Sequence, residues 1–342
     1  HRLNQRQPII SSHPAVSVAH AHTARSTFTF NFNPTWLRLP DGTDALIVRS
    51  SNGTNASTAS TTTNPDYLTL TRIRWSQDGA IVADDINDAS VVLAPHNGST
   101  DDRGVQDPRV VLDPATGLYW LTYRAYGTIG GNQLGIARSS DGITWKTVNY
   151  LPSAFVSAAL LPKNAGGTSK HYMFHGCGAV DVAVSDDLIH WETINSTAAF
   201  GREHWLTGGP KSDPSRGPWA EPGPTPVRLS DGNFLFVVIE AGSPDDEPLC
   251  HFYTPAGEKG YWGAGWVILD GNDPTKILQR GTRLLFPETP WELNGTTSGN
   301  LEDAWEMHGC MIGASIGIAA IEDRKDTFLL FYGAGDSVSG VA

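Results

Sequence analysis

The chain has 342 residues, 24 of them Lys or Arg and 36 Asp or Glu, so its formal net charge is −12. This length suits two ordinary domains or one large all-β domain, and 11 Trp with only 18% charged residues exclude a disordered chain. The acidic balance argues against nucleic acid or anionic membrane as the main partner, and no apolar run reaches the roughly 20 residues that a spanning helix needs.

The N-terminal residues 1–25 are predicted to be an extension ahead of the folded domain. The chain begins at His1 instead of Met, which we expect of a secreted protein whose signal peptide has been removed. His20 and His22 share one strand face, but no third ligand accompanies them, so we expect no metal site there. We expect no cofactor elsewhere in the chain.

Glycosylation signals and cysteines fit the same compartment. Five Asn-x-Ser/Thr sequons lie in polar, turn-like stretches and predict a secreted glycoprotein; they begin at Asn52, Asn55, Asn97, Asn195 and Asn294. Cys177, Cys250 and Cys310 permit at most one disulfide, and the sequence does not choose the pair.

Short β-branched or aromatic runs follow one another from residue 26 onward, and Gly, Pro, Asn or Asp interrupts them about every 8–12 residues. The clearest runs, in chain order, are Asp44–Arg49, Leu118–Tyr123, Asn233–Ile239 and Thr327–Tyr332. Turn signals separate them at Asp41-Gly42, Asp78-Gly79, Asp141-Gly142 and Asp231-Gly232, and residues 50–66 read as an exposed Ser/Thr/Asn-rich loop. The pattern predicts an all-β protein.

A weak internal repeat points to a β-propeller. Ser76–Gly79, Ser139–Trp145 and Ser185–Trp191 each follow a strand-like run, and in the last two a Trp is placed to cover the neighbouring strand. Five blades correspond to about 68 residues each, a suitable size for four short strands and their loops. We therefore predict one five-bladed β-propeller over residues 26–342, with six smaller blades or a sandwich plus a second domain as alternatives.

The innermost strands of a propeller begin near a central funnel, so polar residues at these starts converge on one pocket. The five candidate starts are Asn33-Pro34, Asp107–Arg109, the stretch around Ser157, Pro224–Pro226 and the region around His308. Carboxylates, Arg and aromatic residues at such positions suit the recognition of sugars. We expect an oligosaccharide or polysaccharide as the partner.

Several strings are more specific than strand filler. They are Phe32–Pro34, Gln106–Arg109 with the hairpin Val110–Tyr126, Ala183–Glu192, Trp219–Arg228, Trp262–Leu278 and Phe331–Ala342. In this order and spacing the chain resembles glycoside hydrolase family 130, which contains β-mannoside phosphorylases and β-1,2-mannosidases on five-bladed propellers. The resemblance extends from about Phe32 to Ala342.

The resemblance implies that Asp107 is the catalytic acid. It is the Asp of the family's Glu-Asp-Pro-Arg string, and in the family the acid's proton passes through a sugar hydroxyl. Gln106 departs from the usual Glu and removes a charge beside the acid. We interpret the other three Asp-Pro pairs, which begin at Asp113, Asp213 and Asp273, as turn formers.

The group opposite the acid decides between hydrolysis and phosphorolysis. The cations that bind phosphate in family phosphorylases align near Val156, at His175-Gly176 and at Ile239-Glu240, where this chain has apolar residues, Gly and a carboxylate. A carboxylate repels phosphate but activates water as a general base, so the sequence favours an inverting hydrolase. Glu240 is the first candidate for the base, Glu306 the second and Glu221 the third.

Other residues are candidates for binding the substrate. Arg49 and Asp336 match family positions in the innermost sugar subsite, and Asn33, Arg109, Arg124 and Glu221 are further candidates. His175 is retained from a family pair, although a buried structural histidine is the simpler interpretation. Gly127, Gly130 and Gly131 lack the strand-to-helix setting of a nucleotide loop.

Three alternatives stay open. The first is a phosphorylase that has rebuilt its phosphate site from Arg202, His204 and Lys211. The second is another exo-glycosidase, a furanosidase included, because the fold does not fix the sugar. The third is a propeller that binds glycans without catalysis.

Overall fold

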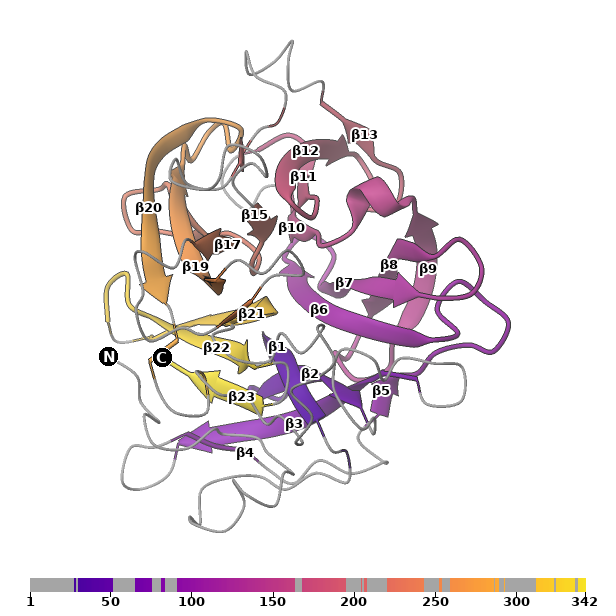
Figure 1. Cartoon of the computed structure of the whole chain (residues 1–342). Coiled ribbons are helices and arrows are strands. Elements are labelled where there is room, and N and C mark those ends of the chain that lie inside the picture. Colours follow the sequence, from indigo (N-terminus) through magenta and orange to yellow (C-terminus); the bar gives the residue numbers. More distant parts are fainter. Residues whose placement is uncertain are drawn as a thin grey trace.

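The strands of the chain form five separate antiparallel sheets, which Figure 1 shows arranged around a common centre. The computed structural model describes residues 28, 30–51, 65–75, 81–83, 91–163, 168–194, 204, 206–207, 220–242, 252–253, 259–285, 287–288, 292, 312–322, 324–335 and 338–342. Five sheets around one axis are a five-bladed β-propeller, so this prediction from the sequence is confirmed.

Each blade is a contiguous part of the chain. Blade 1 contains β1 (Phe30–Arg38), β2 (Asp44–Ser51), β3 (Tyr67–Trp75), β4 (Ile81–Ala83) and β5 (Val91–Leu93). Blade 2 contains β6 (Gly104–Asp113), β7 (Leu118–Tyr126), β8 (Asn132–Ser139) and β9 (Lys146–Leu151). Blade 3 follows the short 3-10 helix η2 (Ser153–Phe155) and contains β10 (Ala159–Leu161), β11 (His171–His175), β12 (Ala179–Ser185), β13 (Glu192–Thr193) and β14 (Leu206–Thr207).

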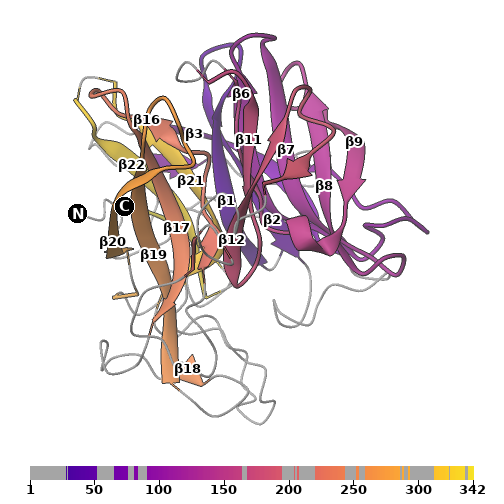
Figure 2. The same ribbon diagram turned by 90° about the horizontal axis from the view of Figure 1, so that it is seen from above.

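Blades 4 and 5 complete the ring. Blade 4 contains β15 (Ala220–Pro222), β16 (Val227–Arg228), β17 (Phe234–Gly242), β18 (Phe252–Tyr253), β19 (Lys259–Leu269) and β20 (Ile277–Leu285). Blade 5 contains β21 (Ile312–Ala320), β22 (Phe328–Ala334) and β23 (Val338–Val341). Seen from above in Figure 2, β17 and β19 extend beyond the strands of the other blades, with β18 at their far end.

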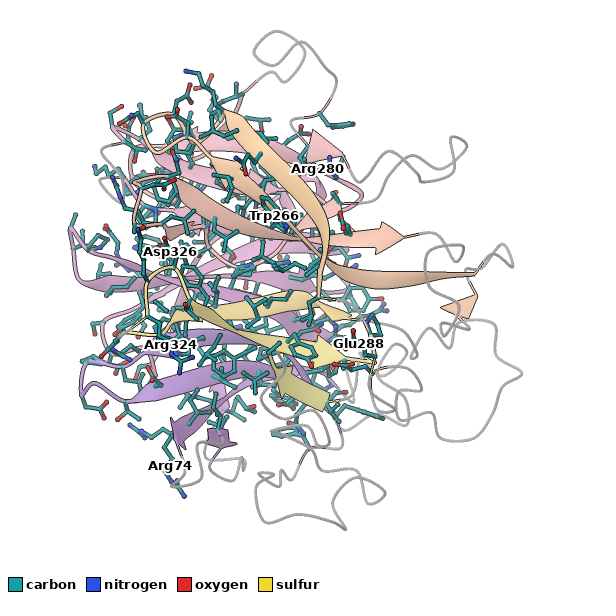
Figure 3. All side chains as sticks on the ribbon, turned by 90° about the vertical axis from the view of Figure 1, so that its left-hand side faces the viewer. Arg74, Trp266, Arg280, Glu288, Arg324 and Asp326 are labelled. Atoms are coloured by element: carbon teal, nitrogen blue, oxygen red, sulfur yellow. The ribbon has the colours of Figure 1, made fainter. Side chains whose placement is uncertain are left out.

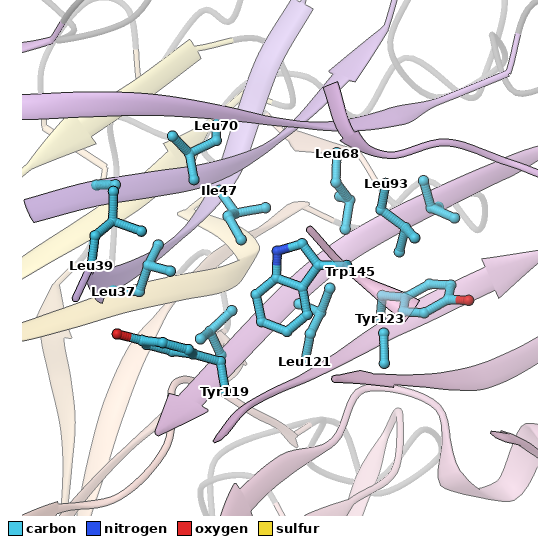
Figure 4. Packing of buried hydrophobic residues seen from close by; sticks show 14 of the residues in the cluster. Leu37, Leu39, Ile47, Leu68, Leu70, Leu93, Tyr119, Leu121, Tyr123 and Trp145 are labelled. Atoms are coloured by element: carbon cyan, nitrogen blue, oxygen red, sulfur yellow. The ribbon is translucent and has the colours of Figure 1, made fainter. Parts of the chain in front are cut away.

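The blades are held together by apolar clusters between neighbouring sheets. Between blades 1 and 2, Leu37 and Ile47 pack with Leu121 and Trp145, as Figure 4 shows. A second cluster closes the ring, with Leu46 and Val48 of blade 1 against residues of blade 5 that include Phe331 and Val341. Burial of these side chains favours folding by about 1.5–3 kcal/mol for each large residue, which stabilises the arrangement of the innermost strands.

The predicted repeat is a real structural device. Ser139 and Ser185 each donate to an Asp two residues later, and the carboxylates of Asp141 and Asp187 accept backbone N–H groups of the turn that follows. Gly142 adopts a φ of 74° in the first turn, and Leu188 takes the equivalent left-handed place with a φ of 63°. Trp145, predicted to cover the neighbouring strand, packs in the apolar cluster between blades 1 and 2. The Ser76–Gly79 copy lies outside the described residues.

The ring closes between the two ends of the propeller. The hydroxyl of Ser339 on β23 donates to the backbone oxygen of Asn31 on β1 over 3.1 Å. The Ser315 hydroxyl of β21 donates to the carbonyl of Pro108 on β6, which connects blade 5 to blade 2. The predicted extension 1–25 lies outside the described residues. None of the helical segments within the described ranges is long and apolar enough to cross a membrane.

Candidate active site

Three residues beside the propeller axis share a left-handed backbone conformation. Asn33, Asp107 and Ser157 have φ values of 50°, 51° and 57°. Asn33 and Asp107 lie on the innermost strands of blades 1 and 2, and Ser157 lies two residues before that of blade 3. The pairing register of β1 shifts between Phe32 and Thr35, and that of β6 shifts between Gln106 and Arg109. Such bulges and left-handed residues redirect side chains and are typical of functional sites.

Asp107 lies at the centre of this arrangement, with only 3% of its surface exposed. Its Oδ1 atom accepts a hydrogen bond of 2.7 Å from Asn33 Nδ2 and another of 3.3 Å from Arg49 Nη1. Burial alone would raise the pKa of Asp107, but the charges of Arg49, Arg124 and Arg109 and the bond from Asn33 together hold this pKa below its ordinary value. The carboxylate is therefore ionised at neutral pH in the unliganded site.

Arg49 is held by a residue that the sequence analysis missed. Its Nε and Nη2 atoms each lie 2.8 Å from Oδ2 of Asp66, which is fully buried, and its guanidinium lies 4.6 Å from the centre of the Phe32 ring. Asp66 directly precedes β3 and follows the Ser/Thr/Asn-rich loop. The one signal was a Pro-Asp pair at the end of that loop.

Gln106 also bonds to Asp66. Its Nε2 atom donates to Asp66 Oδ2 over 2.8 Å, so the side chain beside Asp107 in sequence turns away from it and supports Arg49 instead. The sequence analysis placed the effect of Gln106 directly on the acid. The structure gives it an indirect path through Asp66 and Arg49, at a point where the backbone of β6 bulges.

Arg109 connects opposite sides of the funnel. Its guanidinium donates to the backbone oxygens of Pro222 and Gly223 in blade 4 and to the backbone oxygen of Asp107 in blade 2. Burial lowers the pKa of Arg109, while the charges of Glu221 and Asp107 act in the opposite direction. These bonds give Arg109 a structural task and place both carboxylates within reach of its charge.

Glu221 projects from β15, the innermost strand of blade 4. Its Oε2 atom accepts a bond of 3.1 Å from the Ser157 hydroxyl, and its Oε1 atom accepts one of 3.0 Å from the Cys177 thiol. Burial and the charge of Glu221 raise the pKa of Cys177, so this residue is a neutral thiol. In the structure the innermost strand of this blade begins at Ala220, ahead of the start predicted around Pro224, because residues 220–222 are the ones that pair with β17.

Glu240 lies on β17, one strand further from the axis than β15, and pairs with Ala220 of β15. Its carboxylate packs over Gly265 of β19, and its Oε2 atom is 4.0 Å from Nη2 of Arg280 on β20. Figure 3 shows Arg280 and Trp266 on these strands of blade 4. The first candidate base thus carries an ion pair across its own sheet. The charge of the third candidate, Glu221, acts on Arg109, as the charge of Asp107 does.

Arg124 and His175 flank the site in different ways. Arg124 donates from Nε to Asn132 Oδ1 over 3.1 Å, and its charge acts on Asp107. His175 stacks on Phe155 with 4.4 Å between ring centres, and its Nδ1 lies 3.0 Å from the carbonyl oxygen of Ala154. Because a carbonyl only accepts, this nitrogen carries the proton, and burial lowers the His175 pKa and keeps the ring neutral.

Several predicted residues lie outside the described part of the chain. They are Glu306, Asp336, Arg202, Lys211, Cys250, Cys310, His20, His22 and the sequon residues Asn52, Asn55, Asn195 and Asn294. Asn97 is described and is exposed in a turn, and its glycosylation stays a prediction. His204 lies 3.2 Å from Asp181 Oδ2 through its Nδ1 atom.

Two glycines of blade 5 leave room for Asn33. A Cβ on Gly313 or Gly333 would overlap the Asn33 carboxamide, and a Cβ on Gly333 would also lie 2.5 Å from the Asn33 backbone nitrogen. The hydrogen bond from Asn33 to Asp107 therefore depends on glycine at position 313 of β21 and position 333 of β22.

Gly333→Ala is expected to lower kcat by about 10²-fold, because it displaces Asn33 and with it Asp107. Gly317→Ala is the matched control, since a Cβ there would lie 2.5 Å from the backbone nitrogen of Trp36 at the same blade boundary. Both variants are compared by steady-state kinetics and thermal unfolding. An equal loss of activity in the two variants would show that only packing between the blades had changed.

Comparisons with known proteins agree with this fold. No protein-family model matches the chain. The sequence is 26% identical over 249 residues to the 1,2-β-oligomannan phosphorylase of Thermoanaerobacter sp. (strain X514), over 70% of this chain and 68% of that protein. A glycosyl hydrolase from Bacteroides ovatus has a similar structure, with a TM-score of 0.65 and 21% identity over 94% of this chain and 84% of that one.

A further solved structure carries the family name. Its description states that the GH130 family of mannoside phosphorylases contains glycoside hydrolases that target β-1,2-mannosidic linkages in Candida mannan. It has a TM-score of 0.60 and 20% identity, over 94% of this chain and 84% of that one. The resemblance to glycoside hydrolase family 130 is thus confirmed, and the solved structures share the fold of this chain.

Proposed function

We propose that this chain is an inverting glycoside hydrolase that acts on β-mannosides, with β-1,2-linked oligomannosides as the first substrates to test. The linkage is suggested by the substrates named for the phosphorylase relative and for the hydrolases of the structurally similar family. The observation that carries the proposal is the pair of buried carboxylates, Asp107 and Glu221, whose charges both act on the Arg109 guanidinium.

Asp107 is proposed as the acid. Both hydrogen bonds to its carboxylate from the described residues fall on Oδ1, which leaves Oδ2 for the substrate. In the reaction a proton from Asp107 reaches the glycosidic oxygen through a sugar hydroxyl as the bond from the anomeric carbon to that oxygen breaks. Because the acid must first bind a proton and its pKa is low, activity is expected to decline as pH rises.

Glu221 is proposed as the base, in place of the first candidate from the sequence. Ser157 and Cys177 donate to its two oxygens and fix the plane of the carboxylate. Glu221 would take a proton from water while the water oxygen attacks the anomeric carbon on the face opposite the leaving group, which inverts the configuration. Glu240 lies one strand further from the axis, and its carboxylate faces Arg280.

The positions that align with the phosphate-binding cations support water as the nucleophile. Val156 is buried and apolar, residue 176 is Gly, and Glu240 is a carboxylate with 4% of its surface exposed. Phosphate there would meet negative charge from Glu240 and Glu221, whereas the sites of phosphate-using enzymes gather cations. The competing proposal, a phosphorylase, is favoured by the name of the Thermoanaerobacter relative.

Turnover of β-1,2-mannobiose is expected to proceed at the same rate with and without inorganic phosphate and to release mannose. Water needs no phosphate site, and the negative charges of Glu221 and Glu240 disfavour one. The measurement is the initial rate, with separation of mannose from mannose 1-phosphate. Strict dependence on phosphate, with mannose 1-phosphate as product, would replace the hydrolase proposal by the phosphorylase.

A further inference from the structure

A buried chain of hydrogen bonds connects Gln106 to Asp107 through two intermediate residues. Asp66 Oδ2 accepts from Gln106 Nε2 and from two nitrogens of Arg49, all at 2.8 Å. Arg49 then donates from its remaining terminal nitrogen to Asp107 Oδ1 over 3.3 Å. Sequence neighbours on one strand are thus linked by a path that passes through blade 1.

The backbone fixes this chain of bonds. The amide of Asp66 donates to the carbonyl of Arg103, and the amide of Val105 donates to the carbonyl of Asp66. Asp66 is therefore attached to the same strand that carries Gln106 and Asp107, and its side chain is fully buried. A charge change at position 66 or 106 cannot be relieved by turning the side chain into water.

We propose that Asp66 and Gln106 are positioning residues for the acid of the proposed hydrolase: they hold Arg49 against Asp107, and their combined charge decides how strongly Arg49 stabilises the Asp107 carboxylate. The inference rests on the proposed function for its meaning in catalysis, although its electrostatic content does not depend on turnover. Gln106 supplies a hydrogen bond to Asp66 without a second negative charge.

Other polar and charged groups also face Asp107 and act on its carboxylate. They are Asn33 of β1, Arg49 of β2, Arg109 of β6 and Arg124 of β7, together with Cys177 between β11 and β12. Glu221 of β15 acts on Arg109 and on Cys177. Neither Asp66 nor Gln106 touches Asp107 directly, so a change at either is transmitted through Arg49.

Two substitutions are expected to move the pH dependence in opposite directions. In Gln106→Glu, a carboxylate replaces the amide that lies 2.8 Å from Asp66 Oδ2, and its ionisation competes for Arg49. Asp107 then keeps its proton to higher pH, and the fall of kcat on the alkaline side moves up by about one pH unit. In Asp66→Asn, Arg49 loses its other anionic partner, acts more strongly on Asp107, and the fall moves down by about as much.

The test measures kcat against pH for the wild-type protein and both variants, with circular dichroism to confirm folding. In parallel, the Asp carboxyl carbons are titrated by ¹³C NMR, and the spectrum of Asp107→Asn assigns the Asp107 signal. Opposite shifts in both readouts support the inference, and Gln106→Glu alone carries the test where Asp66→Asn does not fold. Unshifted titrations of Asp107 in folded variants would overturn it.

The two proposals fail separately. If the wild-type protein turns over no β-mannoside, the hydrolase proposal is rejected. The NMR titration still decides whether residues 66 and 106 affect the titration of the Asp107 carboxyl. A wild-type protein with turnover, whose variants lose activity equally at every pH, removes the positioning role and leaves the hydrolase. A merely structural role predicts that second result, since loss of packing does not displace a pH profile.

Discussion

Asp107→Asn is expected to lower kcat by about 10³-fold or more, because an amide has no proton to give to the departing oxygen. The substitution keeps the size and shape of the side chain, so the bonds from Asn33 and Arg49 still have an oxygen to reach. The measurement is steady-state release of mannose from β-1,2-mannobiose. Binding of the same sugar by calorimetry is expected to persist, because only the transferred proton is lost.

The matched control for this variant is Asp113→Asn. Asp113 also precedes a proline, but its carboxylate accepts a bond of 3.1 Å from the Ala115 amide and one of 2.6 Å from the Thr116 hydroxyl, which makes it a turn residue at the far end of β6. Its activity is expected to stay at the wild-type level. Full activity of Asp107→Asn would remove it as the acid, and binding without turnover in the wild-type protein would favour a non-catalytic propeller.

The fold could be predicted because its signals are local. Asp-Gly turns fix hairpins through the left-handed conformation of Gly42, Gly142 and Gly232, which the structure confirms at each of these positions. In the Ser-x-Asp turns of blades 2 and 3, the Ser hydroxyl and the Asp carboxylate bond to residues only two or three positions away. Propensity and turn chemistry operate over a few residues, so these elements are visible in a single sequence.

The site was predictable only in part, because its contacts cross between blades. The interpretations of Asp113 and Asp273 as turn residues are confirmed by their bonds to neighbouring backbone amides. The pairing of Arg49 with Asp107 agrees with a shared subsite, but Asp66 was missed because nothing local connects residue 66 to residues 49 and 106. Such contacts depend on how sheets pack, which periodicity does not encode.

The strand faces explain the change of candidate base. The sequence placed Glu240 first through an alignment of strings, and a strand reverses the direction of its side chains with every residue. In the structure, Glu240 follows Phe236 and Val238 on the face of β17 that packs toward blade 3, and Gly265 leaves the space in which its carboxylate meets Arg280. Glu221 lies on the innermost strand itself, which brings it beside Ser157 and Cys177.

Glu221→Gln is expected to lower kcat by about 10²–10⁴-fold, whereas Glu240→Gln is expected to lower it far less. The glutamine at 221 retains an acceptor for Ser157 or Cys177 but cannot take a proton from water. At 240 the substitution removes one partner of an ion pair with Arg280, whose side chain is 28% exposed and keeps access to solvent. Kinetics of both variants on one substrate separate the two candidates.

A chemical rescue makes the comparison sharper. Glu221→Ala opens space where the proposed base lies, and added azide is expected to restore turnover, because an anionic nucleophile needs no base to deprotonate it. The product would be the glycosyl azide with configuration inverted relative to the β-mannoside, and Glu240→Ala is expected to gain nothing from azide. Rescue confined to Glu240→Ala would reinstate Glu240 as the base. It would also give Glu221 the task of holding Ser157 and Cys177 beside the site.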